Sequence, residues 1–283
     1  MKTFMNPGIF AAIDRIAFNI GGWPVHWYGL IMGLCIMIAY VVFSREGKRK
    51  GIDEETLFDI LFWLVIIGYI GARLYYVAFR FEHYLANPAQ ILMIWQGGIA
   101  IYGGIIAGSL TLYVMGKRSH LNPVTLFDIT APAIMLAQAI GRWGNFINQE
   151  AYGGVVSRTF LERLFLPNFM IEQMLINGNY HHPTFLYESV WNLLGLILLL
   201  SLRRKKQFFR QGEVAASYII WYGVGRAFIE GMRTDSLYLG PLRVSQWLSM
   251  LLVVAGLVFV IYRRTQSYPE IPYYEEDEVD RKA

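Results

Sequence analysis

The sequence contains little charge and almost no cysteine. Only 16% of its 283 residues are charged, against about 25% in typical soluble domains, whereas 55% are hydrophobic. The single cysteine, Cys35, excludes a disulfide framework and a cysteine-based metal site. The net charge of +4 comes from short basic clusters between apolar runs, a distribution that does not indicate nucleic-acid binding. This composition predicts a polytopic membrane protein.

A recognisable cleavable signal peptide is also missing. Residues 1–18 carry Asp14 and Arg15 inside an apolar stretch and lack a clear small-residue cleavage site. We expect this stretch to be an amphipathic segment on the membrane surface, with the first span acting as an uncleaved signal.

Apolar runs of about 20 residues, enough to cross a bilayer, occur seven times and predict an all-α polytopic fold. The expected spans are residues 26–44, 57–79, 97–115, 125–146, 184–201, 214–232 and 245–262. They form one transmembrane domain, residues 1–264, with an outer loop at 147–183. Residues 265–283 form an acidic tail that we expect to be disordered and cytoplasmic.

Lysine and arginine are unevenly distributed among the loops. Fifteen lie after the first, third, fifth and seventh spans, and seven lie in the alternate compartments. By the positive-inside rule, the N-terminus is outside and the C-terminus is in the cytoplasm, which agrees with an odd number of spans. Glycines at GxxxG spacing, Gly29/Gly33 and Gly104/Gly108, are expected to allow close helix packing.

Three arginines, Arg73, Arg142 and Arg226, fall inside the outer halves of predicted spans. Each costs roughly 2.5–3.5 kcal/mol on insertion scales and is a functional hypothesis by default. Three glutamates expected at the same depth neutralise part of this charge, and a phosphate would satisfy the rest, because the guanidinium fork matches phosphate oxygens. These glutamates are Glu150, Glu188 and Glu230. At the outer leaflet, the abundant phosphate belongs to a phospholipid headgroup.

The sixth span carries Tyr222, Arg226 and Glu230 on one helical face, at i, i+4 and i+8. A purely structural Arg226–Glu230 ion pair is therefore an alternative to a ligand site. Arg142 has no comparable partner on its own helix, which favours a functional role, and Asn145 lies one turn further on. Asn148 and Glu150 follow in a loop that is expected to fold back over the site.

The motif "GRWGNFINQEAYGG" (141–154) resembles the signature of the prolipoprotein diacylglyceryl transferase family. Further segments typical of the family occur in the same order along the whole chain. They are "HWYGL" (26–30), "GARLYYV" (71–77), "GGIAIYGGIIAG" (97–108), "HPTFLYES" (182–189) and "YGVGRAFIEGMR" (222–233).

The resemblance implies a seven-span enzyme of the bacterial cytoplasmic membrane whose active site faces the outer leaflet. It would move the diacylglyceryl group of phosphatidylglycerol onto the lipobox cysteine thiol of preprolipoproteins, releasing glycerol 1-phosphate. The implied partners are these two substrates and membrane lipids, with no nucleic acid, cofactor or metal. The family's essential arginine falls on Arg142 and a second important one on Arg226. Family positions for activity or lipid contact match Tyr28, Asn145, Gly153, Tyr222 and Glu230.

One position departs from the family pattern, since Tyr102 stands where a histidine is familiar. A tyrosine, with a reference pKa near 10, is a poor base at neutral pH. Tyr102 therefore orients groups by hydrogen bonding, or the base lies elsewhere, with His26 and His182 as candidates.

Other functional classes stay open. An anion transporter also gathers arginines, although it would need access from both sides of the membrane. An intramembrane protease would need a Ser/His or aspartate pair at membrane depth, and a CDP-alcohol phosphotransferase a metal-binding aspartate cluster. We find none of these patterns, because Asp59 and Asp128 fall near inner ends. Without the resemblance, the sequence indicates a phospholipid-handling membrane protein.

Overall fold

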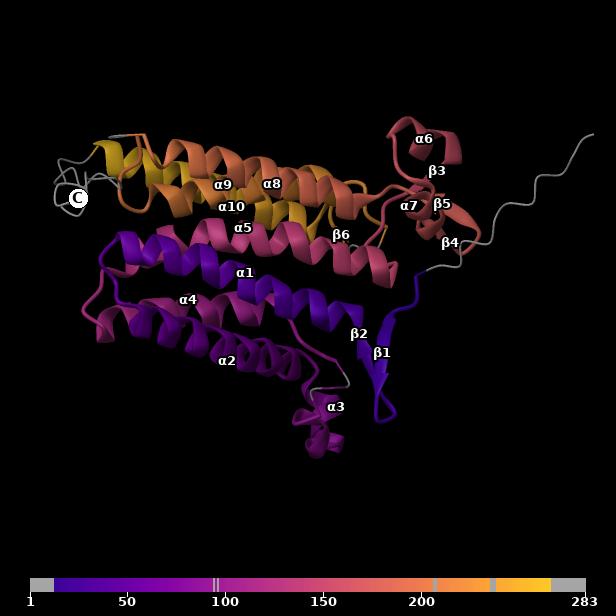
Figure 1. Ribbon diagram of the computed structural model, residues 1–283, viewed down its shortest axis with the longest axis horizontal. Helices are drawn as coiled ribbons and strands as arrows, with labels where there is room; N and C mark the ends of the chain where they lie inside the picture. The colour runs from indigo at the N-terminus through magenta and orange to yellow at the C-terminus, as the bar shows by residue number, and fades with distance from the viewer. Residues whose placement is uncertain (1–12, 94, 96, 206–207, 235–237, 266–283) are drawn as a thin grey trace, which may run out of the picture. The chain divides into compact units, whose positions relative to one another are not determined.

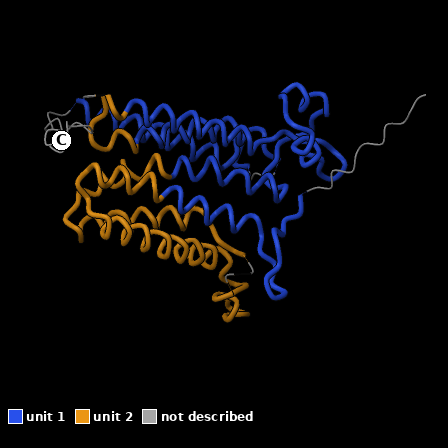
Figure 2. The backbone as a smooth tube through the Cα atoms, viewed as in Figure 1, with its two compact units in different colours: residues 1–39, 134–202, 216–268 blue, residues 40–133, 203–215, 269–283 orange. Residues whose placement is uncertain are grey.

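The computed structural model describes residues 13–93, 95, 97–205, 208–234 and 238–265. The predicted tail and most of the predicted surface segment lie outside these residues. The chain divides into two compact units (Figure 2). Unit 1 comprises residues 1–39, 134–202 and 216–268, and unit 2 comprises 40–133, 203–215 and 269–283. Each is described by itself below.

Long helices dominate the described residues, and seven of them have 18 or more residues (Figure 1). They are α1 (Trp27–Arg49), α2 (Glu54–Phe79), α4 (Ile101–Arg118), α5 (Pro123–Asn148), α8 (Thr184–Leu202), α9 (Glu213–Glu230) and α10 (Val244–Thr265). Five of these, α1, α2, α5, α8 and α10, are long and apolar enough to cross a membrane. The chain is therefore a mostly helical, multi-pass membrane protein.

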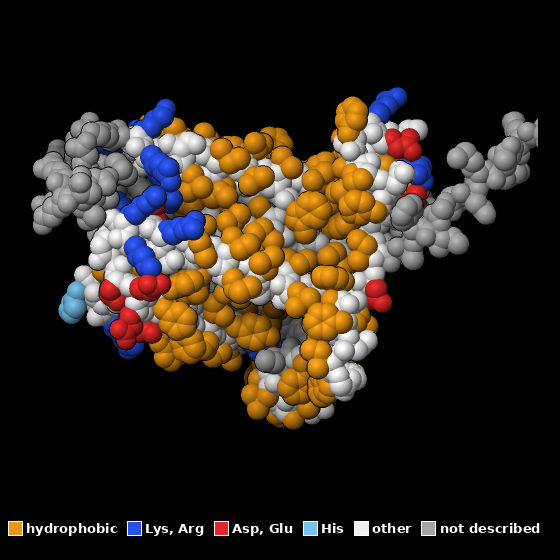
Figure 3. Space-filling view, in the orientation of Figure 1, with side chains coloured by type: hydrophobic (Ala, Val, Ile, Leu, Met, Phe, Trp, Pro, Cys, Tyr) orange, Lys and Arg blue, Asp and Glu red, His pale blue; other side chains and the backbone are white. Residues whose placement is uncertain are grey.

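The outward faces of the long helices are apolar. Figure 3 shows hydrophobic side chains over most of the visible helix surface, with charged side chains gathered toward the helix ends. In α10, for example, Leu251, Val258 and Ile261 are all more than half exposed. Contiguous apolar surface of this extent is rare on soluble monomers, so these faces are suited to lipid.

Within unit 2, α2 and α4 pack closely through glycines. A Cβ added at Gly103 would collide with the backbone of Gly71 and the side chain of Tyr75, and one at Gly71 would collide with Ala107. The GxxxG prediction is confirmed for Gly104 and Gly108, because an added Cβ would lie 3.5 Å from the Gly68 carbonyl oxygen at Gly104 and 3.4 Å from Leu64 Cδ1 at Gly108. It is wrong for Gly29 and Gly33, where an added Cβ meets no described atom within 4 Å.

Arg73 determines where α4 begins. This buried side chain donates to four backbone carbonyls, those of Gln90 (2.6 Å), Ile91 (3.0 Å), Gly97 (2.5 Å) and Gly98 (2.7 Å). Gly97 and Gly98 have φ of 82° and 79°, which places them outside any helix. The predicted span start at residue 97 is therefore wrong, and α4 starts at Ile101.

The expectation of an all-α fold omits short strands and helices between the long helices. The end of the predicted surface segment, residues 16–18, lies in β1 (Ile16–Ile20), which forms a hairpin with β2 (Trp23–His26). Strand β6 (Tyr238–Leu239) pairs with β7 (Leu242–Arg243). A three-stranded sheet, in the order β3-β5-β4, lies inside the predicted outer loop. Its strands are β3 (Val155–Val156), β4 (Leu175–Ile176) and β5 (Asn179–His181). The short helices are α3 (Phe81–Ala86), η1 (Pro88–Ile91), α6 (Arg158–Arg163) and α7 (Asn168–Gln173).

Within unit 2, buried polar groups also connect segments that are far apart in the sequence. Asp128 accepts hydrogen bonds from the backbone nitrogens of Gly212 (2.6 Å) and Ala215 (2.9 Å), which satisfies donors at the start of α9. Glu46 pairs with Arg203 at 3.0 Å. Asp128 thus has a structural role away from the predicted site.

Candidate functional site

The motif at residues 141–146 presents a different side chain on each face of the last turns of α5. On one face, Gly144 leaves room for Tyr28 of α1, whose ring carbon Cδ2 would come within 2.8 Å of an added Cβ. On another, the Trp143 indole donates to Ser189 Oγ of α8 at 3.2 Å and packs edge-on against Phe185. These contacts fix the rotation of α5 and therefore the direction of Arg142.

Among the described residues, Arg142 belongs to a network of four charged side chains from three helices. Its Nε pairs with Glu188 Oε2 of α8. The other carboxylate oxygen, Oε1, accepts from Arg226 Nη1 of α9 at 3.0 Å. Arg226 Nη2 also pairs with Glu230 Oε2 at 2.6 Å. The predicted Arg226–Glu230 pair is therefore confirmed, and it is one part of a larger network that brings both predicted arginines onto one carboxylate.

The two arginines differ in what they leave unused. Arg226 has both terminal nitrogens in ion pairs. Arg142 is engaged only through Nε, and its terminal nitrogens form no hydrogen bond with another described residue. Its side chain is 20% exposed, whereas the glutamates are almost fully buried. Arg142 thus offers two free N–H donor groups in the planar arrangement that suits a phosphate or carboxylate.

A reciprocal tryptophan pair sets the register of α8 against α9. The Trp191 and Trp221 rings stack at 4.4 Å, and each indole donates to the other's backbone carbonyl, at 3.0 and 2.9 Å. Gly195 and Gly225, each four residues after a tryptophan, seat the opposite ring, because a Cβ at either position would collide with it. This register places Glu188 opposite Arg226.

This tryptophan pair was not predicted from the sequence. Its signal is present as a repeated WxxxG spacing in "WNLLG" (191–195) and "WYGVG" (221–225). The spacing in either segment does not by itself predict that the two helices are neighbours.

The segment after α5 folds onto the end of that helix. Gln173 is buried and its amide donates to the carbonyls of Phe146 (3.2 Å) and Ile147 (3.1 Å), two of the groups left without helical partners. A small apolar core of Phe146, Leu161, Ile171 and neighbouring residues lies beneath. The predicted outer loop is thus an ordered unit attached next to Arg142.

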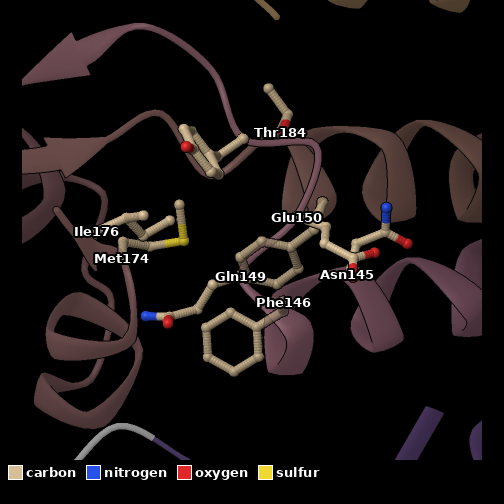
Figure 4. Close-up of a pocket in the computed structure, with 9 residues that line it drawn as sticks. Asn145, Phe146, Gln149, Glu150, Met174, Ile176 and Thr184 are labelled. Carbon is tan, nitrogen blue, oxygen red and sulfur yellow. The ribbon is translucent and has the colours of Figure 1, made fainter. Parts of the chain in front are cut away.

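A narrow pocket separates the end of α5 from this segment (Figure 4). It has room for about one water molecule. Asn145 and Glu150 line it together with Gln149, Met174 and Thr184. Glu150 is exposed, and its backbone nitrogen donates to the Asn145 carbonyl at 2.9 Å. Asn148, the last residue of α5, is half-buried. The structure thus places Asn145 and Glu150 together beside the charge network.

Gly153 and His182 lie against each other where this segment enters α8. A Cβ at Gly153 would meet His182 Cβ at 2.7 Å and the Met232 carbonyl at 3.1 Å, so this position accepts no side chain. His182 Nδ1 lies 3.2 Å from the Tyr187 hydroxyl. Burial lowers the pKa of His182 below its ordinary value. Its imidazole is therefore neutral at pH 7.

Three other predicted residues lie outside the network. Tyr222 is one turn before Arg226 on α9, tilted against Tyr218 at 6.1 Å. His26 is exposed at the end of β2. Tyr102 lies in unit 2, in the first turn of α4, is 39% exposed, and forms no hydrogen bond with another described residue.

Arg73, grouped with the other arginines in the sequence analysis, has a different role. Its guanidinium is occupied by backbone carbonyls and lies 5.3 Å from the Tyr84 ring centroid. It has no free fork to offer an anion. The expectation that three arginines gather at one anion site is therefore wrong for Arg73.

The comparisons with known proteins identify the family of the chain. A family model described as prolipoprotein diacylglyceryl transferase matches residues 15–262. Proteins named phosphatidylglycerol–prolipoprotein diacylglyceryl transferase align along most of the chain. The one from Bacillus cereus is 51% identical over 263 residues, covering 93% of this chain and 97% of its own length. That from Enterococcus faecalis is 49% identical over 275 residues, covering 97% and 98%. That from Pediococcus pentosaceus is 47% identical over 265 residues, covering 94% and 95%. A chain that carries these motifs, this charge network and this similarity over nearly its whole length belongs to the prolipoprotein diacylglyceryl transferase family.

Proposed function

We propose that this chain transfers the diacylglyceryl group of phosphatidylglycerol to the lipobox cysteine thiol of a preprolipoprotein. The products are a thioether-linked lipoprotein precursor and glycerol 1-phosphate. The observation that carries the proposal is that two arginines from separate helices pair with one carboxylate, while the terminal nitrogens of Arg142 have no partner among the described residues. The relatives from Pediococcus pentosaceus and Bacillus cereus are named for the same reaction, which supports the proposal.

The nucleophile is the substrate's own thiolate. It attacks the glycerol carbon that bears the phosphate, a C–S bond forms, and the C–O bond breaks with its electron pair leaving on the phosphate oxygen. Arg142 and Arg226 grip the phosphate and stabilise the charge that develops on the leaving group. Their positive field also favours ionisation of the incoming thiol. No covalent enzyme intermediate is required.

The remaining predicted residues are assigned supporting roles. Tyr28, Asn145 and Tyr222 orient the lipid headgroup, and Glu230 fixes Arg226. Asn148, Glu150, Gly153 and His182 shape the outer side of the site, and the neutral His182 is a candidate base for the thiol proton. Tyr102 takes part through hydrogen bonding rather than as a base.

We further propose that residues 1–264 act as one catalytic domain with seven spans in the bacterial cytoplasmic membrane, with the N-terminus outside and the tail in the cytosol. Helices α4 and α9 have 18 residues each, roughly 27 Å at the helical rise, close to the bilayer core thickness. The distribution of Lys and Arg supports this orientation. Reporter fusions within residues 147–183 should report an extracytoplasmic location, and a cytosolic one would reverse the proposed side of the site.

The reaction is tested with purified protein, phosphatidylglycerol vesicles and a lipobox peptide. Mass spectrometry should detect the thioether product, together with one glycerol 1-phosphate per transfer. Absence of both, with phosphate flux across vesicles containing the protein, would favour an anion transporter instead. Tyr102→Phe and Tyr102→His in the same assay test that residue. Activity should survive the histidine change and fall with phenylalanine if the hydroxyl orients the substrate.

A further inference from the structure

Glu188 has no assigned role in the proposed reaction. Among the described residues, however, it is the one that pairs with both Arg142 and Arg226. It is 6% exposed and comes from α8, while Arg142 and Arg226 come from α5 and α9. One carboxylate oxygen serves each arginine. The carboxyl group therefore stands between the guanidinium groups as a phosphate would.

We propose that Glu188 is a positioning residue that holds Arg142 by Nε, so that the terminal nitrogens face the lipid phosphate. We further propose that its charge limits how tightly the two arginines retain the anionic product. This inference rests on the proposed transfer reaction and deepens it.

The positioning role of Glu188 follows from which nitrogen of Arg142 it contacts. Glu188 takes Nε of Arg142, on the inner edge of the guanidinium plane, and leaves the two outer nitrogens without described partners. A long arginine side chain otherwise samples many rotamers, and ordering it carries an entropic cost. Because Glu188 is buried and also held by Arg226 at 3.0 Å, that ordering is present before the lipid arrives.

The proposed effect of Glu188 on product retention follows from the charges in the network. Two arginines and two glutamates, Glu188 and Glu230, give a formal charge of zero. An incoming phosphodiester thus meets two pre-aligned donor groups without an excess of positive charge that would hold the departing phosphate. Both Glu188 oxygens already face guanidinium groups, so neither is free to take the thiol proton.

The test compares wild type with Glu188→Gln, Glu188→Asp, Arg142→Lys and the double variant Glu188→Gln/Arg142→Lys. Steady-state transfer is measured for each, with glycerol 1-phosphate as the inhibitor, in detergent-purified protein corrected for its folded fraction. Glu46→Gln is the matched control, because Glu46 is a buried glutamate paired with an arginine, Arg203, outside the proposed site.

In Glu188→Gln, kcat should fall about 10- to 100-fold, because the arginine is no longer held in place. Inhibition by glycerol 1-phosphate should become about 10-fold tighter, because the network gains a net positive charge. A merely structural loss would not strengthen anion binding. Glu188→Asp keeps the charge but shortens the reach, so kcat should fall while inhibition stays at the wild-type level. In the Arg142→Lys background, Glu188→Gln should lower kcat little further, since the two substitutions remove the same interaction.

Any one of three results would overturn the inference. They are inhibition of Glu188→Gln at the wild-type level, a wild-type kcat in Glu188→Asp, and losses of kcat that add fully in the double variant. Glu188→Asp keeps the test decisive if Glu188→Gln cannot be purified. Glu46→Gln should leave both kcat and inhibition unchanged after correction for folding. A wild-type protein that makes no thioether product would instead refute the proposed function, so the two failures are distinguishable.

Discussion

Arg73 in unit 2 and the Arg142–Arg226 pair in unit 1 show two ways to keep arginine within a membrane-spanning helix. Arg73 is closed off, since four backbone carbonyls and the Tyr84 ring surround it. Arg142 and Arg226 are neutralised by carboxylates, and Arg142 keeps its terminal nitrogens unpaired. The same residue type therefore stabilises a loop in one unit and leaves hydrogen-bond donors available in the other.

The difference lies in the partner. Carbonyls accept hydrogen bonds but carry no formal charge, so Arg73 needs several of them and its donors are used up. A carboxylate balances the charge through one or two contacts and leaves donors free. An arginine in a span is thus a candidate ligand site when its counter-charge is a carboxylate and its donors exceed its partners.

Arg73→Gln should destabilise unit 2 by about 3–5 kcal/mol, because several buried carbonyls lose a charged donor. Thermal unfolding in detergent should shift downward, and residues 90–98 should become sensitive to protease. Arg80→Gln is the control, since Arg80 is exposed just after α2. A large loss of lipid transfer by Arg73→Gln protein of unchanged stability would mean that Arg73 acts in the site after all.

Arg142→Lys should show the opposite pattern, with little loss of stability and about a 100-fold fall in kcat for thioether formation, as for removal of one transition-state donor. Lysine keeps the charge and loses the planar fork. Arg158→Lys serves as the control, because Arg158 pairs with Glu162 and Glu172 outside the long helices. Near-normal transfer by Arg142→Lys would count against the phosphate clamp.

Gly225→Ala should cost about 1–3 kcal/mol, because its Cβ enters the space of the Trp191 ring. It should also reduce transfer, since the register that sets Glu188 against Arg226 shifts. Gly29→Ala, with no described atom within 4 Å, should be neutral or slightly stabilising. Differential scanning fluorimetry measures the stability of Gly225→Ala and Gly29→Ala, and the transfer assay measures their activity. Equal effects of the two substitutions would show that the tryptophan pair does not set the register.

Gly98→Ala should destabilise more than Gly97→Ala. Both positions need a left-handed backbone, which costs about 1–2 kcal/mol for alanine. At Gly98 the new Cβ would also come within 2.5 Å of Arg73 Nη1, whereas at Gly97 it meets nothing within 4 Å. Equal unfolding temperatures for the two variants would show that Arg73 can move away without loss.

The smallest expected effect is a pH dependence from His182. Its folded pKa lies below the ordinary value of 6.5, so above that pH both the folded and unfolded states are neutral there. As the pH falls below 6.5, the unfolded chain takes up a proton first, and stability decreases. The opening free energy of residues 149–183, obtained from hydrogen exchange after division by the intrinsic rate at each pH, should therefore fall on acidification, and His182→Gln should flatten that response. An identical response in His182→Gln would assign it to other groups.

Much of the fold could be predicted from sequence because lipid demands long apolar runs. The predicted ranges overlap the seven long helices, and the errors fall at their ends, where backbone rather than hydropathy decides. Residue 97 is apolar in context yet lies outside α4, because its carbonyl goes to Arg73. The strand pairing of β1 with β2 was missed, because a surface hairpin of a few residues has the same composition as an amphipathic segment.

The candidate site was only partly predictable. The unusual cost of charge at membrane depth singled out Arg142, Arg226 and Glu230. Helical spacing predicted the Arg226–Glu230 contact, which is local to one helix. Glu188 was predicted only as a general counter-charge, because no spacing rule relates α8 to α5 or α9.

Hydropathy, charge and motif are properties of the linear chain, so they are enough to identify a membrane-spanning member of its family and the few polar residues at membrane depth. The enclosure of Arg73 by carbonyls and the sharing of Glu188 by Arg142 and Arg226 emerge only in the folded chain. A hydrogen-bond partner on another helix depends on the rotation and register of both helices. Those are set by the shapes of contacts such as Gly144 with Tyr28 and Trp191 with Trp221.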